Sequence, residues 1–272
     1  MNKSRRKPIQ KVLWKKYVWQ RQTVAQLAHE YHRSTSWISR QLDQAPFATA
    51  VKIEPRPLAI VADTTFNGRS WGVCVLRSPK LKKNLAWQVV KKETVDAYHE
   101  CRWRLEQKGF EITAAVIDGK PGVCAAFWDV PIQMCQFHQI AIITRYLTAK
   151  PKLEAGKELR DLTLTLPRTD EVAFKAGLDA WLQKWQSFMN EKSCNPETGR
   201  KFFTHKRLRS AYRSLARNKE ILFTYQRYPG LNLPNTTNSL EGSFTLVKEM
   251  LRIHRGLKTR RKIKLITAIL AK

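Results

Sequence analysis

The chain has 272 residues, 43% of them hydrophobic, enough to bury the core of one large domain or two modest ones. Its 50 Lys and Arg against 22 Asp and Glu give a net charge of +28. Because so many like charges repel one another in the folded state, the composition predicts a polyanionic partner, nucleic acid rather than membrane. No run of about 18 apolar residues could span a bilayer, and the first residues, MNKSRRKPIQ, contain no apolar stretch that resembles a signal peptide. The five cysteines are scattered without a CxxC pair, which suits a reducing cytoplasm, and we expect a nucleoid-associated protein there.

Residues 1–45 predict a small all-α region that binds DNA. Apolar residues at helical spacing indicate one helix in the first twenty residues and two short helices after it, the last from about Ser36. The tight join HRSTS supplies Ser and Thr as helix caps, which is typical of a helix-turn-helix. Ser36, Ser39, Arg40 and Gln41 are then expected to face DNA. The alternative is a plain helical hairpin.

Residues 46–56 contain helix-breaking prolines and predict a linker. Beyond it the pattern changes to strands, and residues 57–150 predict a mixed α/β sheet. The continuous apolar run of ITAAVID indicates a central, parallel strand. In chain order we expect strands over 58–66, 71–77 and 85–92, a helix over 95–107, a strand over 112–118, a short helix over 121–129, a short strand over 131–136 and a helix over 137–148.

From 151 to 230 the strands are expected to stop, because aromatic and aliphatic residues fall at helical spacing. We interpret these aromatics first as core, and only secondarily as stacking platforms for unpaired bases. Residues 231–272 predict a last helix through SLEGSFTLVKEMLRIHRG, followed by a basic tail.

Two aspartates mark the most apolar strands. Asp63 is expected at the end of the first strand, and Asp118 ends ITAAVID just before Gly119. Ligands of open α/β sheets bind beyond the carboxyl ends of strands, so two adjacent strands would bring these carboxylates together. Carboxylate oxygens suit Mg²⁺, and a pair of such ions can drive phosphoryl transfer. Taken singly, each Asp could be an ordinary turn residue.

Glu241 is the third candidate. It could equally close a capping box with Asn238 as the N-cap, which would explain it by structure alone. At the helix start, beside the buried stripe, it could also face a metal. Glu249 is a weaker competitor further along the helix.

Cys135 and His138 follow the short strand at a spacing that could bind zinc. A structural zinc site needs four ligands, and only the distant Cys194 and His205 could complete it. A buried cysteine beside a hydrogen-bonded histidine is the favoured interpretation.

Together these motifs resemble the DDE transposases of bacterial insertion sequences in the Mutator-like superfamily, over roughly residues 57–260. The matching elements are VADTTF, VIDGKPGV, CQFHQ and TTNSLEGSF, in that order. The resemblance implies an RNase H-like mixed sheet interrupted by an α-helical insertion domain, which accounts for the long separation of Asp118 from Glu241. One departure is that no cysteine precedes Cys74, whereas many relatives carry a zinc ribbon before the helix-turn-helix.

By this resemblance Asp63, Asp118 and Glu241 would be catalytic and would coordinate Mg²⁺ (or Mn²⁺), as two ions, with Cys135 and His138 as structural support. The implied reaction is hydrolysis and strand transfer at the ends of an insertion sequence. The implied partners are double-stranded DNA, both terminal inverted repeats and target, and further copies of the chain in a dimer or higher oligomer. The alternatives are a catalytically inactive or domesticated DNA-binding regulator, and a structure-specific nuclease or resolvase.

Overall fold

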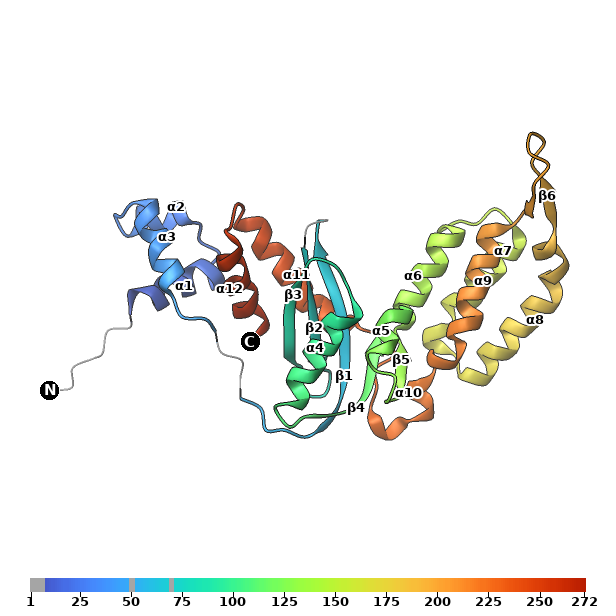
Figure 1. The fold of residues 1–272 in the computed structure, drawn as a ribbon, viewed down its shortest axis with the longest axis horizontal. Coiled ribbons are helices and arrows are strands. Elements are labelled where there is room, and N and C mark those ends of the chain that lie inside the picture. The colour runs from blue at the N-terminus through green and yellow to red at the C-terminus, as the bar shows by residue number, and fades with distance from the viewer. Residues whose placement is uncertain (1–7, 49–51, 69–70) are drawn as a thin grey trace.

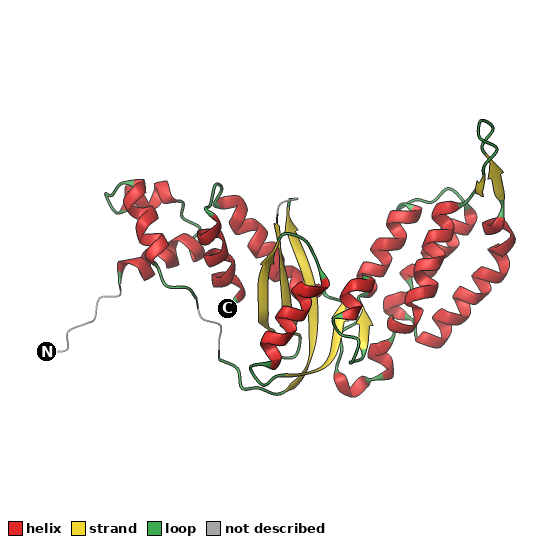
Figure 2. Cartoon of the chain, viewed as in Figure 1, coloured by secondary structure: helices red, strands yellow, loops and turns green. Residues whose placement is uncertain are grey.

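The computed structural model describes residues 8–48, 52–68 and 71–272, which form three lobes in a row (Figure 1). Small helices from both ends of the chain form the first lobe. A sheet with flanking helices forms the middle lobe, and a bundle of long helices forms the third (Figure 2). The third lobe comes from one continuous segment that leaves the sheet after its last strand and returns before α11 (Asn238–Ile253).

The N-terminal helices are α1 (Ile9–Trp19), α2 (Val24–Glu30) and α3 (Thr35–Gln44). Thr23 and Gln26 close a capping box at α2, and the Ser34 hydroxyl accepts a hydrogen bond from the Trp37 amide at the start of α3. The expected helices are confirmed. Residues 1–7, and residues 49–51 of the expected linker, lie outside the described part of the chain.

The five-stranded sheet has the order β3-β2-β1-β4-β5. Antiparallel pairing joins β1 to β2 and β2 to β3, and parallel pairing joins β1 to β4 and β4 to β5. The mixed sheet and the parallel β4 are therefore confirmed, and the arrangement is compatible with an RNase H-like fold. The strands are β1 (Pro57–Asn67), β2 (Trp71–Ser78), β3 (Lys83–Val90), β4 (Glu111–Ile117) and β5 (Ile132–Met134).

Alternate residues of β1 pack into different cores on the two sheet faces. Ile60 and Ala62 join the core beneath α4 (Val95–Glu106) and α5 (Pro121–Ala125). Val61 joins the core that contains α11 and the N-terminal helices. A side chain two residues after Val61 therefore points to the α11 face.

The third lobe consists mainly of α6 (Gln136–Leu147), α7 (Glu154–Leu164), α8 (Glu171–Asn190) and α9 (Lys206–Asn218). A short α10 (Thr224–Arg227) and the 3₁₀ turns η1 (Leu166–Arg168), η2 (Lys219–Ile221) and η3 (Pro229–Leu231) complete it. Phe174 and Trp181 are buried, and the Trp181 indole donates to the Ala155 carbonyl at 3.0 Å, so these aromatics belong to the core as expected.

The expectation that strands stop after residue 151 was wrong at one place. A hairpin of β6 (Lys192–Cys194) and β7 (Lys201–Phe203) projects from the end of this lobe (Figure 1). Its turn is built by Asn195, whose Oδ1 accepts from the Glu197 and Thr198 amides, and by Gly199 at φ +66°. Strands of three residues are too short to show alternation in sequence.

The basic tail was also predicted incorrectly. Residues Thr259–Leu270 form α12, which buries Leu265, Ile266 and Ile269 in the core shared with α11 and the N-terminal helices. These apolar residues form one helical stripe. The many Lys and Arg residues before them led to the prediction of a basic tail in place of a helix. Among the described residues no helix is both long enough and apolar enough to cross a membrane.

Candidate catalytic and nucleic-acid-binding site

Strand register places Asp63 and Asp118 side by side. The parallel pairing of β1 with β4 ends at Val61 opposite Val116, and each aspartate follows two residues later on its own chain segment. Asp63 does not end its strand as expected, because β1 continues and pairs Asp63 with Val75 of β2. It lies instead where β4 stops, which leaves its flank open toward Asp118. Register, rather than the end of β1, creates the site.

Gly119 lets the chain turn away immediately after Asp118. Its φ is +79°, a left-handed conformation that favours glycine. A Cβ built there would lie 2.5 Å from the Met134 Sδ of β5. The turn is closed by the Lys120 amide, which donates to Asp118 Oδ1 at 3.1 Å. A residue with a side chain at position 119 would therefore have to move the buried Met134 side chain and would strain the turn after Asp118.

The carboxylate of Asp63 lies where negative charge is unfavourable. The pKa of Asp63 is raised to about 6, mainly by burial and in smaller part by the charges of Asp118 and Glu93, against the lowering effect of His138. The Thr64 amide partly offsets this by donating to Asp63 Oδ1 at 2.7 Å. A cation placed here would relieve that cost.

Glu93, between β3 and α4, is an acidic member of the site that the sequence reasoning missed. Its side chain is only 9% exposed, it accepts a hydrogen bond from the Tyr98 hydroxyl at 2.6 Å, and it forms an ion pair with Lys120. The same Lys120 ammonium lies 3.4 Å from Asp118 Oδ2. Burial opposes the charge of Lys120, but Glu93 and Asp118 outweigh it, so the pKa of Lys120 is raised. No spacing signal in the sequence connects these residues.

Cys135 and His138 connect the aspartates to the start of α11. The Thr237 amide and hydroxyl donate to the Cys135 Sγ at 3.3 and 3.5 Å. Burial favours the neutral thiol, but His138 and Thr237 outweigh it and lower the pKa of Cys135. Cys135, together with the charges of Asp63 and Asp118, raises the pKa of His138 to about 9. His138 is therefore favoured in its charged form, within reach of the charges of both aspartates.

The same junction is joined by two further residues that the sequence reasoning did not single out. The Gln136 amide donates to the Asn235 carbonyl, and the Asn235 side-chain amide donates to Gln136 Oε1, both at 2.9 Å. Since α6 and α11 begin on either side of these bonds, the segment that leads into Glu241 is tied to the segment that follows β5.

Glu241 is not a helix cap. The N-cap of α11 is Thr237, no side chain caps it, and Glu241 is exposed in the first turn. The capping box with Asn238 as N-cap is absent because Asn238 already lies inside α11, and the N-cap residue Thr237 bonds to Cys135. The competing Glu249 forms an ion pair with Arg21 at 2.8 Å.

The structure does not draw the three carboxylates into one tight cluster. The described residues contain no group of three or more His, Cys, Asp or Glu side chains close enough to hold a metal ion. Asp63 and the first turn of α11 share one face of the sheet, as Val61, Leu240 and Phe244 of the common core show. The described residues likewise do not group Cys194 and His205 with Cys135 and His138 as the zinc alternative requires. His205 pairs instead with Glu191 Oε2 at 2.9 Å.

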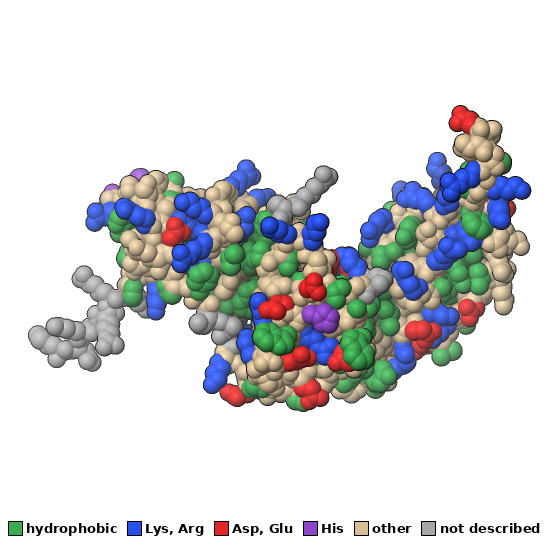
Figure 3. Space-filling view, viewed as in Figure 1, with side chains coloured by type: hydrophobic (Ala, Val, Ile, Leu, Met, Phe, Trp, Pro, Cys, Tyr) green, Lys and Arg blue, Asp and Glu red, His purple; other side chains and the backbone are tan. Residues whose placement is uncertain are grey.

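A groove leads from Asp118 into the helical lobe. We call it the α6–α9 groove; its volume is about 300 Å³. Its cations are Lys120, Arg145 and Arg217, with His138 beside them, and Asp118 stands at its head. Lys and Arg also spread over the helical lobe and the N-terminal helices in surface view (Figure 3). Such a surface suits phosphate groups next to the carboxylates.

The four residues of α3 expected to face DNA differ in accessibility. Ser36 and Arg40 are exposed, whereas Ser39 and Gln41 are partly buried. The Ser39 carbonyl accepts from Arg261 at 3.0 Å, and Gln41 Oε1 accepts from Gln10 Nε2 at 2.8 Å. In this arrangement Ser36 and Arg40 are the two with side chains open to a partner.

Comparisons with known proteins add little to this geometry. No family model matches the chain, and no curated protein matches it. Among solved structures, it is similar to a chain of the Drosophila P element transposase strand transfer complex, at 13% identity and a TM-score of 0.37. That match covers 97% of this chain and 91% of the other.

Proposed function

We propose that this protein is a DNA transposase of the DDE type, which hydrolyses and joins DNA at the ends of an insertion sequence. The observation that carries the proposal is the β1–β4 register, which sets Asp63 beside Asp118 at the head of a cationic groove. The net charge of +28 supports a nucleic-acid substrate.

Asp63, Asp118 and Glu241 are the residues we assign to hold two Mg²⁺ or Mn²⁺ ions. The donor set fits, because all three are carboxylates and burial raises the pKa of Asp63, a cost that a neighbouring cation would offset. When bound, such ions supply activation of a nucleophile and stabilisation of the leaving oxygen. Glu241 extends from the first turn of α11, whose N-cap residue Thr237 is bonded to Cys135, and its assignment rests on the motif TTNSLEGSF.

His138 and Lys120 are assigned to supporting roles. His138 opposes the rise in the pKa of Asp63, and the Lys120 ammonium lies 3.4 Å from Asp118 Oδ2, so both are placed to attract a phosphodiester. Substrate DNA is expected to be read by α3, with backbone affinity from the basic surface. Two DNA ends need two copies of the chain, so a dimer or larger oligomer on DNA belongs to the proposal.

The test is cleavage of DNA that carries the genomic flanks of the gene, with Mg²⁺ or Mn²⁺ present. Asp118→Asn is expected to abolish cleavage, at least a thousand-fold, because the carboxylate charge is lost while the amide keeps its size. Binding of the same DNA in EDTA should be retained. The exposed Asp179→Asn, on α8, is the matched control and should cleave as the unaltered protein does.

Cleavage that persists in Asp118→Asn would contradict the assignment of Asp118. Binding without cleavage in the unaltered protein, at a locus that lacks inverted repeats, would favour a DNA-binding regulator. Cleavage without joining of precleaved ends in a strand-transfer assay would favour a structure-specific nuclease or resolvase.

A further inference from the structure

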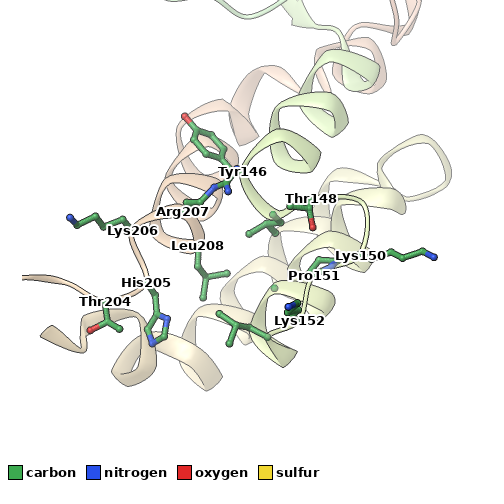
Figure 4. A pocket seen from close by; sticks show the side chains of 13 residues that line it. Tyr146, Thr148, Lys150, Pro151, Lys152, Thr204, His205, Lys206, Arg207 and Leu208 are labelled. Carbon is green, nitrogen blue, oxygen red and sulfur yellow. The ribbon is translucent and has the colours of Figure 1, made fainter. Parts of the chain in front are cut away.

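The α6–α9 groove reaches from the middle lobe into the helical lobe, where a second hollow adjoins it. Tyr146, near the end of α6, lines this groove and also lines a second hollow of about 420 Å³. This end pocket lies between the last turn of α6, the loop 148–153, and the starts of α7 and α9 (Figure 4). The two hollows therefore adjoin at Tyr146, and we call the surface that they form along α6, from Asp118 to the loop 148–153, the path.

The end pocket has an apolar interior and a basic rim. Leu147, Leu153 and Leu208 line it together with His205, and Lys150, Lys152, Lys206 and Arg207 surround it. In Figure 4 the Lys150 and Lys206 side chains extend outward from the pocket, whereas Leu208 lies at its centre. The described residues that line it include no carboxylate. An occupant with one apolar and one anionic part matches this lining.

Two side chains of the path have separate tasks. Arg207 Nη2 donates to the Arg145 carbonyl at 2.8 Å, which joins the start of α9 to the end of α6 and gives the path a fixed wall. Tyr146 is 37% exposed, so a large part of its ring surface is open to a ligand. An exposed aromatic ring among cations is the arrangement that binds unpaired nucleotides, since the base stacks and the phosphates meet the charges.

The length of the path can be converted into nucleotides. Tyr146 follows His138 by two turns and a fraction of α6, about 12 Å at 1.5 Å per residue. A DNA strand that keeps the stacked spacing of a duplex advances about 3.4 Å per nucleotide. Tyr146 therefore lies about three to four stacked nucleotides from His138, which lines the groove together with Asp118.

We propose that the α6–α9 groove and the end pocket bind one unpaired DNA strand next to the reacting phosphodiester. Arg145 and Arg217 contact its phosphates, and a base stacks on Tyr146. This inference rests on the proposed function and specifies the form of its substrate: a strand opened for about four nucleotides on one side of the reaction point, rather than an intact duplex.

The first test measures binding, in EDTA, to duplexes with single-stranded 3′ or 5′ overhangs of zero, two, four and six nucleotides. For the unaltered protein we expect affinity to rise about ten-fold when the overhang of one polarity reaches about four nucleotides. Tyr146→Ala should lose this rise, and Tyr146→Phe should keep it because the ring remains. Tyr228→Ala removes a tyrosine 46% exposed that lines neither hollow, and should behave as the unaltered protein.

The second test concerns the phosphate contacts. Arg217→Gln should lower the slope of log affinity against log salt by about one for the four-nucleotide overhang. Arg213→Gln is the matched control, because Arg213 is exposed on the same helix but lines a different hollow. Its effect should be the same for blunt and overhanging DNA.

The outcomes separate this inference from the proposed function. Equal affinity for all overhangs, or an overhang preference that survives in Tyr146→Ala, overturns the strand path while duplex binding and cleavage still stand. If the unaltered protein bound no DNA at all, both the strand path and the proposed function would be overturned. Because binding is measured without metal, an inactive catalytic site cannot imitate failure of the path.

Discussion

At the scale of single residues, the site depends on side chains that carry charge in partly buried places. Asp63 is destabilised in its ionised form, and His138 and Lys120 are stabilised in theirs. The sequence indicated Asp63, Asp118, Cys135 and His138 through local motifs. It contained no comparable signal for Glu93 or Lys120, because an ion pair between residues far apart in the chain leaves no periodicity.

Asp63→Asn is expected to stabilise the metal-free protein above pH 6. Because the folded pKa is raised to about 6, ionisation of Asp63 weakens the fold as pH rises from about 4 through 6. A shift of about two units corresponds to at most about 3 kcal/mol. The free energy of unfolding, measured in EDTA, should therefore rise by about 1–3 kcal/mol at pH 8 and change little at pH 4.

The exposed control Asp179→Asn should leave the pH dependence unchanged. If Asp63→Asn proved destabilising at pH 8, the ionised carboxylate would stabilise the metal-free fold. The inference that its charge is unfavourable without a cation would then be wrong.

At the scale of elements, the site exists because strand ends and helix starts meet at one point. β1 and β4 bring the aspartates together, and the junction of Cys135 with Thr237 fixes the start of α11. Element existence was predictable from apolar periodicity, apart from the β6–β7 hairpin and α12. Register was not, because Asp63 lies within β1 and no pattern in the sequence shows where its pairing with β4 ends.

Gly119→Ala is expected to destabilise the protein by about 2–4 kcal/mol and to abolish cleavage. The new Cβ would contact Met134 of β5, and the left-handed backbone at φ +79° would be strained. Urea denaturation at constant slope measures the first effect. Gly242→Ala is the matched control, because a Cβ there meets open space in α11 and should stabilise by about 0.5–1 kcal/mol.

If Gly119→Ala unfolded at the same urea concentration as the unaltered protein, the turn after Asp118 would have another geometry. If stability fell while cleavage per folded molecule persisted, Gly119 would serve the fold and not the position of Asp118.

At the scale of the whole molecule, the two ends of the chain pack together. The buried Lys264 ammonium of α12 donates to the carbonyls of Leu42, Asp43 and Ala45 at the end of α3. Arg261 binds both carboxylate oxygens of Asp43 at 2.7 and 2.8 Å, and the Tyr17 and His254 rings stack with centroids 3.8 Å apart. The helices proposed to read DNA are thus held against the lobe that carries the carboxylates.

Lys264→Met is expected to loosen this attachment. The apolar chain keeps the volume but leaves the carbonyls at the end of α3 without a donor, which costs about 2–3 kcal/mol. Limited proteolysis of the full chain should then cut first between α3 and β1. The exposed Arg260→Gln should show the unaltered pattern, and identical proteolysis of both variants would contradict the anchoring role of Lys264.

The sequence by itself determined the element types, the mixed sheet, the helical segment and the expectation of a polyanionic partner, because apolar period and net charge are properties of short windows and of totals. Tertiary structure decided which carboxylates meet, that Glu241 is free of a capping bond, and that the basic tail is a packed helix. Those outcomes depend on register and on contacts between residues far apart in the chain, such as Cys135 with Thr237 and Lys264 with Ala45, and such contacts leave no local pattern.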